Sequence, residues 1–284
     1  MKACFKFTVS LLMLCAMAWS CQKVQRQPAA SQTDQSTAEE TSAPAEEKPE
    51  EAAVPDGARR LMKAYPDFVK GFENGKLLMA DGSKIVYDDG RKKDYNQLLD
   101  EADPEDMFCM PYDRNNWHPT FEGDLPQDPG RIRCEAFFKS MYGHSAEEVR
   151  RTLVNVSWFG QSVQITRLNG AADALRKVAE EIKGKPELQS YVKSSGSFYW
   201  RQVRFANRLS AHSYGMTIDI AVSKSDYWAW ASKNHSETKR GIPYKNQFPH
   251  ALVEIFERNG FIWGGRWYHY DTMHFEYRPE LLVK

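Results

Sequence analysis

Hydrophobic and polar residues alternate in two stretches of the chain, and each stretch predicts a β-hairpin. Between residues 74 and 90, three Asn-Gly or Asp-Gly pairs bracket two short apolar runs, which is typical of strands joined by tight turns. Between residues 153 and 170, apolar side chains alternate on both sides of a turn expected near Gly160. Both patterns predict antiparallel pairing of strands that are neighbours in the sequence.

Two further stretches have the three-to-four-residue apolar spacing of amphipathic helices. In residues 171–184 the apolar positions form one stripe, and a glycine ends the stretch. In residues 249–260 a proline stands at the start and Asn259-Gly260 at the end. Because strands and helices are mixed without regular strand-helix-strand alternation, the pattern favours the α+β class.

The first part of the globular sequence, residues 58–150, is less regular and predicts an N-terminal elaboration of unknown role. Within it, residues 104–130 are rich in proline, aspartate and aromatic residues, which favours irregular structure beside a cleft. Cys109 and Cys134 also lie in this part of the chain. In an oxidising compartment they could pair as one disulfide, and two separate buried thiols are the alternative.

Residues 1–21 have the pattern of a secretory signal peptide. Lys2 and Lys6 precede an apolar run from Phe7 to Trp19. This run is shorter than the roughly 20 apolar residues that a membrane span needs. The sequence Ala18-Trp19-Ser20-Cys21 resembles a bacterial lipobox, in which Cys21 is lipidated and becomes the new N-terminus. The alternative is cleavage before Cys21 by an ordinary signal peptidase, which would give a soluble secreted protein.

Residues 22–57 predict a disordered linker. They consist mainly of small, polar and acidic residues with no aromatic side chain, so they cannot bury enough apolar surface to offset the entropy of ordering. The whole chain has 38 basic and 38 acidic side chains, so no basic excess indicates a nucleic-acid partner. Together these features predict a lipoprotein of the bacterial cell envelope, anchored to the membrane through Cys21 on its periplasmic side.

Candidate catalytic chemistry is concentrated in two alternating stretches near the C-terminus. Residues 216–222 predict a strand with Asp219 on its polar face, and His212 precedes a glycine at which the chain can turn back. In the second stretch, His274 lies on the face opposite the apolar residues, and Asp271 comes three residues earlier. Strand interiors disfavour aspartate, so Asp219 needs a partner.

Two imidazoles and one carboxylate are the ligand set of a hydrolytic zinc site, in which the fourth position stays open for water. This chemistry assigns His212, Asp219 and His274 to the metal and Asp271 to proton transfer as a general base. An arginine would stabilise the oxyanion or bind a substrate carboxylate. The alternatives are structural: a core histidine at position 212, and an ion pair between Asp219 and an arginine.

Two motifs resemble those of a known family. The sequence SAHSYGMTID, residues 210–219, matches an SxHxxGxxxD pattern, and DTMHFE, residues 271–276, is similar to a second pattern that lies about 55 residues further along. The resemblance is to the zinc D-alanyl-D-alanine carboxypeptidases, a family that includes phage L-alanyl-D-glutamate endolysins and shares a fold with the Hedgehog signalling domain. It implies a catalytic domain over residues 151–284, with a small antiparallel sheet, flanking helices and a zinc cleft.

The resemblance also assigns roles residue by residue. It implies that His212, Asp219 and His274 bind Zn²⁺, that Asp271 is the general base, and that Ser210 supports the ligands from behind. Relatives often have glutamate as the base, so Asp271 is one methylene shorter than usual. The family's upstream arginine corresponds to Arg201 in SGSFYWR, with Arg204 and Arg208 as competitors. His269 is a rival ligand, but its odd offset from His274 on an extended strand would point it to the other face.

The function that the resemblance implies is hydrolysis of peptide bonds in the stem peptides of peptidoglycan. The bond is either the terminal D-Ala-D-Ala bond, cleaved by a carboxypeptidase, or an internal bond, cleaved by an endopeptidase. The alternative is a module of the same fold that contains zinc and binds the cell wall without turnover.

Overall fold

The computed structural model describes residues 53–204, 206–232 and 235–283. The predicted signal peptide, Cys21 and most of the predicted linker lie outside the described residues. Among the residues that are described, no helix has the length and apolar character needed to cross a membrane.

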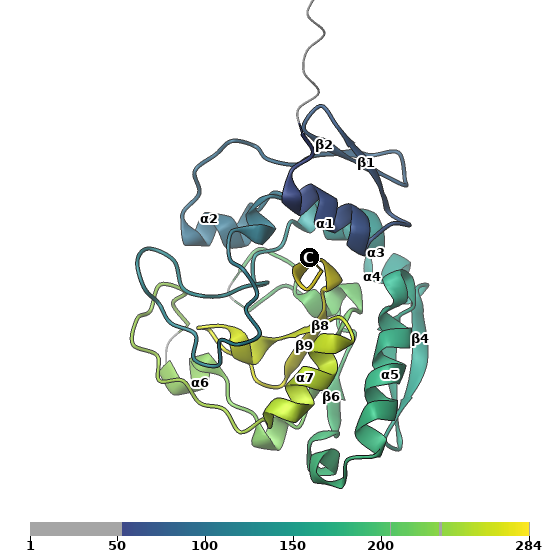
Figure 1. Cartoon of the computed structure of the whole chain (residues 1–284), viewed down its shortest axis with the longest axis vertical. Helices are drawn as coiled ribbons and strands as arrows, with labels where there is room; N and C mark the ends of the chain where they lie inside the picture. The colour runs from purple at the N-terminus through teal and green to yellow at the C-terminus, as the bar shows by residue number, and fades with distance from the viewer. Residues whose placement is uncertain (1–52, 205, 233–234, 284) are drawn as a thin grey trace, which may run out of the picture. The chain divides into compact units, whose positions relative to one another are not determined.

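The described chain contains both helices and short strands (Figure 1). The α-helices are α1 (Asp56–Ala64), α2 (Tyr95–Asp100), α3 (Glu135–Tyr142), α4 (Ala146–Arg150), α5 (Ala171–Lys183), α6 (Trp228–Ser232) and α7 (His250–Arg258). The strands are β1 (Val69–Glu73), β2 (Lys76–Met79), β3 (Lys84–Val86), β4 (Leu153–Trp158), β5 (Gln161–Thr166), β6 (Ser194–Gly196), β7 (Thr217–Ile220), β8 (Phe261–Trp263) and β9 (His274–Tyr277).

The strands form three antiparallel sheets, ordered β1-β2-β3, β4-β5 and β6-β7-β9-β8. This combination of helices with small antiparallel sheets agrees with the predicted α+β class. In the four-stranded sheet, β7 and β9 are direct neighbours although about 55 residues separate their sequences. Their register places Asp219 opposite His274 and Thr217 opposite Glu276.

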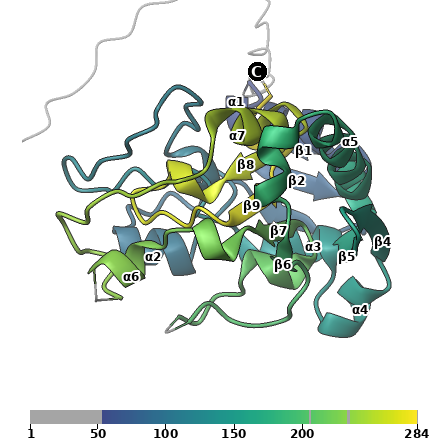
Figure 2. The ribbon, with the colours of Figure 1, turned by 90° about the horizontal axis from the view of Figure 1, so that it is seen from below.

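One face of the four-stranded sheet carries the main apolar core. Ile218, Ile220 and Phe275 belong to this core together with the buried faces of α5 and α7, which lie on the same side of the sheet (Figure 2). The rings of Phe256 and Phe275 stack with centroids 3.9 Å apart. Because strand side chains alternate between faces, the residues between these apolar positions, including Asp219 and His274, lie on the opposite face.

The elements predicted between residues 153 and 260 are confirmed. The β4–β5 hairpin turns through Phe159 and Gly160, whose φ angles are +43° and +78°, as a type I′ turn requires at both central residues. Helices α5 and α7 occupy the two predicted helical stretches, with Pro249 as the N-cap of α7 rather than its first helical residue.

The prediction for residues 74–90 was incomplete. The expected hairpin is β2–β3, but the Asn74-Gly75 turn also joins β2 to β1. Strand β1 has the sequence VKGFE. Its charged residues and glycine leave too few apolar positions for a recognisable two-residue alternation. Residues 104–130 contain only the short 3₁₀ segment η1 (Asp106–Phe108) and are otherwise irregular, as expected.

The N-terminal elaboration shares a core with the segment that carries His212. Helices α1 and α3 and strands β1 and β2 contribute to one apolar cluster with Ala211, Tyr214 and Met216. The described residues from 53 onward belong to one compact unit. Helix α1 begins at Asp56, so the predicted linker ends at least two residues earlier than expected.

The disulfide considered for Cys109 and Cys134 is absent, which corrects that expectation. Both cysteines are free thiols: Cys134 is buried and Cys109 is exposed. Burial raises the pKa of the Cys134 thiol to about 11, so this residue behaves as a small apolar side chain in the core. It precedes the first residue of α3.

Candidate metal centre

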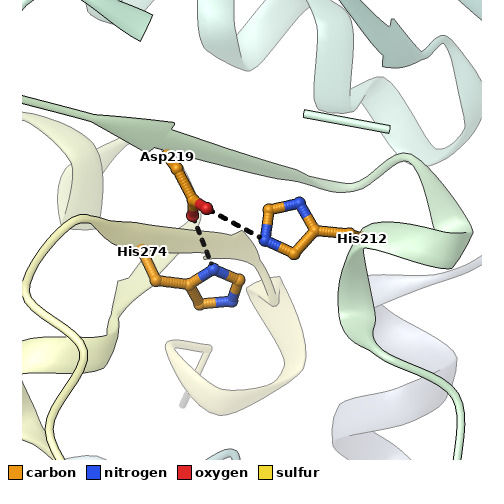
Figure 3. A group of neighbouring side chains, drawn as sticks. All are labelled: His212, Asp219 and His274. Carbon is orange, nitrogen blue, oxygen red and sulfur yellow. Dashed lines mark hydrogen bonds and ion pairs between the residues drawn. The ribbon is translucent and has the colours of Figure 1, made fainter. Parts of the chain in front are cut away.

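His212, Asp219 and His274 meet on the polar face of the four-stranded sheet (Figure 3). Nε2 of His212 lies 3.3 Å from Oδ2 of Asp219, and Nδ1 of His274 lies 2.9 Å from Oδ1 of the same carboxylate. One ligand atom from each residue lies within 4.8 Å of the other two. The β7–β9 register brings Asp219 and His274 together, and the segment before β7 supplies His212.

A glycine makes this approach of His212 possible. His212 lies on the 3₁₀ segment η4 (Ala211–Tyr214), and Gly215 follows with φ of +63°, a conformation that favours glycine. A Cβ atom at Gly215 would lie 2.5 Å from Cδ2 of Leu153. The turn at Gly215 therefore returns the chain into β7 so that His212 and Asp219 face each other.

The ring of His212 is oriented by groups behind it. Its Nδ1 donates to the backbone carbonyl of Ser197 and lies 2.9 Å from Oγ1 of Thr217. Because a carbonyl can only accept a hydrogen bond, the proton of the neutral ring is held on Nδ1. The lone pair of Nε2 is then directed toward Asp219, as metal binding requires.

The ring of His274 is oriented in the opposite sense. Its Nε2 lies 3.0 Å from Oε1 of Glu276, a carboxylate that is only 1% exposed. Glu276 in turn accepts from Arg133 at 3.1 Å and from Arg278 at 3.3 Å. Because the Glu276 carboxylate accepts a hydrogen bond from Nε2–H of His274, the other ring nitrogen, Nδ1, is the one that faces Asp219.

Neighbouring charges keep the carboxylates of Asp219 and Glu276 ionised despite their burial. Burial alone would raise the pKa of Glu276, but Arg133, His274 and Arg278 lower it to about 2. His212 and His274 likewise outweigh burial and hold the pKa of Asp219 well below its usual range. Burial disfavours the charged form of His274, but Asp219 and Glu276 raise its pKa to about 10. A metal ion therefore competes with a proton for Nδ1, and its binding releases that proton.

Asp271 supplies a second carboxylate beside the three ligand candidates. Its backbone is fixed by hydrogen bonds to Gly264 and from His274, at 3.0 and 3.2 Å. Its Oδ1 atom is buried and has no hydrogen-bond partner among the described residues. Burial and the nearby Asp219 raise the pKa of Asp271 to about 6, although His274 opposes this. An unpartnered carboxylate oxygen with a raised pKa is suited to accept and release a proton.

Arg201, predicted to contact substrate, and Ser210, predicted to support the ligands, line one cleft of about 120 Å³ together with the metal group, Tyr227 and Trp267. The Arg201 backbone accepts from the Ser210 amide, and its guanidinium makes no ion pair with any described residue. The competitor Arg208 is paired with Asp100 and Glu237. Ser210 lines the cleft, but the groups behind the histidine rings are Ser197, Thr217 and Glu276.

His269 lies outside the metal group, for a reason different from the one predicted. Strand β9 begins only at His274, so the expectation that both histidines lie on one extended strand was wrong. His269 occupies the turn before the strand, and its Nδ1 lies 2.5 Å from Oδ2 of Asp128. His269 is therefore kept away from the ligands by its hydrogen bond to Asp128, and not by pointing to the other face of a strand.

The donor set fits a catalytic zinc ion. Two neutral imidazoles and one carboxylate are three protein ligands, the number that catalytic zinc sites use. Each imidazole has its second nitrogen held by a carbonyl or carboxylate, an arrangement typical of zinc-binding histidines. The buried Oδ1 of Asp271, which lacks a protein partner, also indicates that a further group binds in this cleft.

Comparison with known proteins gives one match. Residues 204–277, about a quarter of the chain, match the profile of a family described as D-alanyl-D-alanine carboxypeptidase. The matched segment includes the metal group and Asp271 but begins after Arg201. No curated protein and no solved structure shows significant similarity to the chain. The match supports a metallopeptidase-type enzyme.

The metal group generates a prediction about zinc content. Replacing His212 or His274 with alanine is expected to reduce bound zinc to well below one ion per chain, because two protein ligands do not complete the site. Glu276→Gln breaks buried ion pairs and is expected to lower the free energy of unfolding by about 3–5 kcal/mol. In the folded variant, zinc affinity is expected to weaken by about 10–100-fold, because the charge behind His274 is removed. Elemental analysis and competition with a chelating dye measure zinc content and zinc affinity.

Glu254→Gln, on the exposed face of α7, is the matched control and should leave zinc affinity unchanged. Full zinc occupancy in His274→Ala, with loss in His269→Ala, would show that the wrong histidine has been assigned. Unchanged affinity in Glu276→Gln would show that Glu276 is only structural.

Proposed function

We propose that the chain is a zinc-dependent peptidase that hydrolyses peptide bonds in the stem peptides of peptidoglycan, and that residues 151–284 share the fold of the D-alanyl-D-alanine carboxypeptidases. The observation that carries this proposal is the cross-strand Asp219–His274 pair, with His212 completing a three-ligand set beside Asp271. The family match over residues 204–277 supports the same activity.

His212, Asp219 and His274 would hold the zinc ion. When bound, zinc polarises a substrate carbonyl and lowers the pKa of water toward about 7. The protein contribution is to orient both rings so that Nε2 of His212 and Nδ1 of His274 face Asp219 in the cleft. Ser197 and Glu276 do this by accepting hydrogen bonds from the opposite ring nitrogens.

Asp271 is proposed as the general base. Its buried Oδ1 would take a proton from the attacking water and pass it to the nitrogen of the leaving amine. The Asp219 carboxylate is paired with both histidines, and the Glu276 carboxylate is paired with His274, Arg133 and Arg278. Asp271 is therefore the carboxylate of the cleft whose oxygen is available for proton transfer.

Arg201 is proposed to bind a carboxylate of the substrate. It lines the cleft, and its guanidinium makes no ion pair within the described chain, so it can offer a bidentate hydrogen-bond donor. A terminal D-Ala carries such a carboxylate, which favours D-alanyl-D-alanine carboxypeptidase activity over endopeptidase activity. The masses of the products from defined muropeptides distinguish the two.

Asp271→Asn tests the assignment of the base. The amide keeps the shape of the side chain but cannot accept the proton, so kcat is expected to fall by about 10²–10⁴-fold. Zinc content and substrate binding should be retained. The measurement is hydrolysis of a muropeptide that ends in D-Ala-D-Ala, with zinc content determined on the same sample.

Asp271→Glu is the companion variant, and partial activity is expected because it restores the carboxylate with one extra methylene. Hydrolysis by Asp271→Asn at the wild-type rate would exclude Asp271 as the base. Wild-type protein with one zinc ion and no turnover of any muropeptide would instead favour the alternative function, a zinc-containing module that binds the cell wall.

We further propose that Cys21 is lipidated and that residues 22–52 tether the enzyme to the membrane beside its polymeric substrate. The support is the signal-like pattern of residues 1–21 and the polar composition that follows it. Metabolic labelling with a fatty-acid probe should label the wild-type protein and leave Cys21→Ser unlabelled. An unlabelled wild-type protein in the soluble fraction would support the secreted alternative.

A further inference from the structure

A second histidine–aspartate pair lies in the cleft and takes no part in the metal group. His269 lines the cleft, and Asp128 contacts it twice from the irregular segment of the N-terminal elaboration. Oδ2 of Asp128 lies 2.5 Å from Nδ1 of the His269 ring, and Oδ1 accepts from the His269 backbone amide at 2.9 Å. The same carboxylate thus fixes both the backbone and the ring.

The charge of Asp128 determines which ring nitrogen carries the proton. Asp128 is fully buried and also accepts from the Tyr95 hydroxyl and, at 3.3 Å, from Arg131. Burial alone would raise its pKa, but Arg131, His269 and Tyr95 lower it to about 2. A carboxylate at Nδ1 holds the proton of the neutral ring there. Nε2 of His269 is therefore left with its lone pair.

That lone pair has no partner within the described residues. Nε2 of His269 is buried and accepts no hydrogen bond, and a buried polar atom in this state normally indicates a missing ligand or water. The ring of His269 cannot turn toward another partner, because the Trp228 ring packs edge-on against it, with centroids 4.6 Å apart, and the Tyr95 ring stacks on it, with centroids 6.1 Å apart. The neighbouring Arg131, which also lines the cleft, is itself bound to Glu237 through two hydrogen bonds of 2.8 and 2.9 Å.

We propose that His269, oriented by Asp128, is a substrate-contacting residue whose Nε2 accepts a hydrogen bond from a backbone N–H group of the stem peptide. The inference rests on the proposed function, because it needs a peptide in the cleft. The cleft is also lined by arginines, which only donate, and by the carboxylates of Asp271 and Glu276, which the proposed function assigns to proton transfer and to His274. A peptide offers both acceptors and N–H donors, and His269 supplies the neutral acceptor that its N–H groups require.

The pair also gives the N-terminal elaboration a role in the site. Asp128 and Tyr95 both belong to residues 58–150, whereas His269 belongs to the segment that carries Asp271 and His274. The elaboration therefore sets the tautomer of a cleft residue that lies two positions before Asp271.

Nitrogen-15 NMR of histidine-labelled protein tests the contact directly. The sample is the zinc-loaded Asp271→Asn variant, titrated with a muropeptide that ends in D-Ala-D-Ala. Before titration, Nε2 of His269 should have the chemical shift of an unprotonated ring nitrogen. During titration its resonance should move and saturate with the peptide. An Nε2 that is protonated in the free protein, or one whose shift stays constant, would overturn the proposal; a constant shift would indicate a buried water as its partner.

Kinetics of the zinc-loaded enzyme provides a second readout. His269→Asn keeps an amide donor near the Nδ1 position, so it can still bond Asp128, but it removes Nε2. It is expected to lower kcat/KM by about tenfold or more while retaining one zinc ion per chain. Asp128→Asn should act in the same direction because its amide can donate to Nδ1 and move the ring proton to Nε2. His144→Asn, at an exposed loop position, is the matched control and should match the wild type.

The outcomes separate this inference from the proposed function. Hydrolysis by the wild type together with an unchanged kcat/KM in folded His269→Asn would overturn the role of His269 and leave the peptidase intact. A wild type that neither binds nor hydrolyses the muropeptide would overturn both. Loss of zinc from His269→Asn would identify His269 as part of the metal site and would also contradict the inference.

Discussion

The buried carboxylate of Glu276 is the interaction on which the site depends. It accepts from His274 on one oxygen and is paired with Arg133 and Arg278, all of them buried or nearly so. Arg278 is also paired with Glu280, which is fully buried. Taking such charges out of water costs several kcal/mol per ion, and removing one partner of a buried pair typically costs about 3–5 kcal/mol. The ligand His274 is therefore held by a charge network that exists only if the whole fold is formed.

This network explains why the N-terminal elaboration and the sheet form one body. Arg133 lies just before α3, and Glu280 accepts from Tyr65, the residue after α1. On its other face the same sheet packs Phe275 against α7. The alternation of β9 therefore connects an apolar core on one side to a charged cluster on the other, and His274 projects from the charged side.

Much of the fold and the ligand set could be predicted because the signals are local. Alternation around Asp219 and His274 placed both on polar strand faces, and the glycine after η4 marked the turn that brings in His212. Arg133 and Asp128 were missed because they lie in or beside irregular structure, where no periodicity shows what a side chain faces. The two-residue spacing of Glu276 from His274 on a strand puts both on one face, but only the long-range approach of Arg133 shows that Glu276 stays charged there. The order of β7 next to β9 is likewise a long-range pairing that the sequence pattern does not specify.

We infer that the fold orients His212, Asp219 and His274 to bind one zinc ion. Anomalous diffraction at the zinc edge, from crystals of the zinc-loaded protein, tests this inference. We expect a single strong peak about 2.0–2.2 Å from Nε2 of His212, Nδ1 of His274 and the Asp219 carboxylate. A peak coordinated by His269 or Asp271 in place of one of these residues, or no ordered peak at this site, would contradict it.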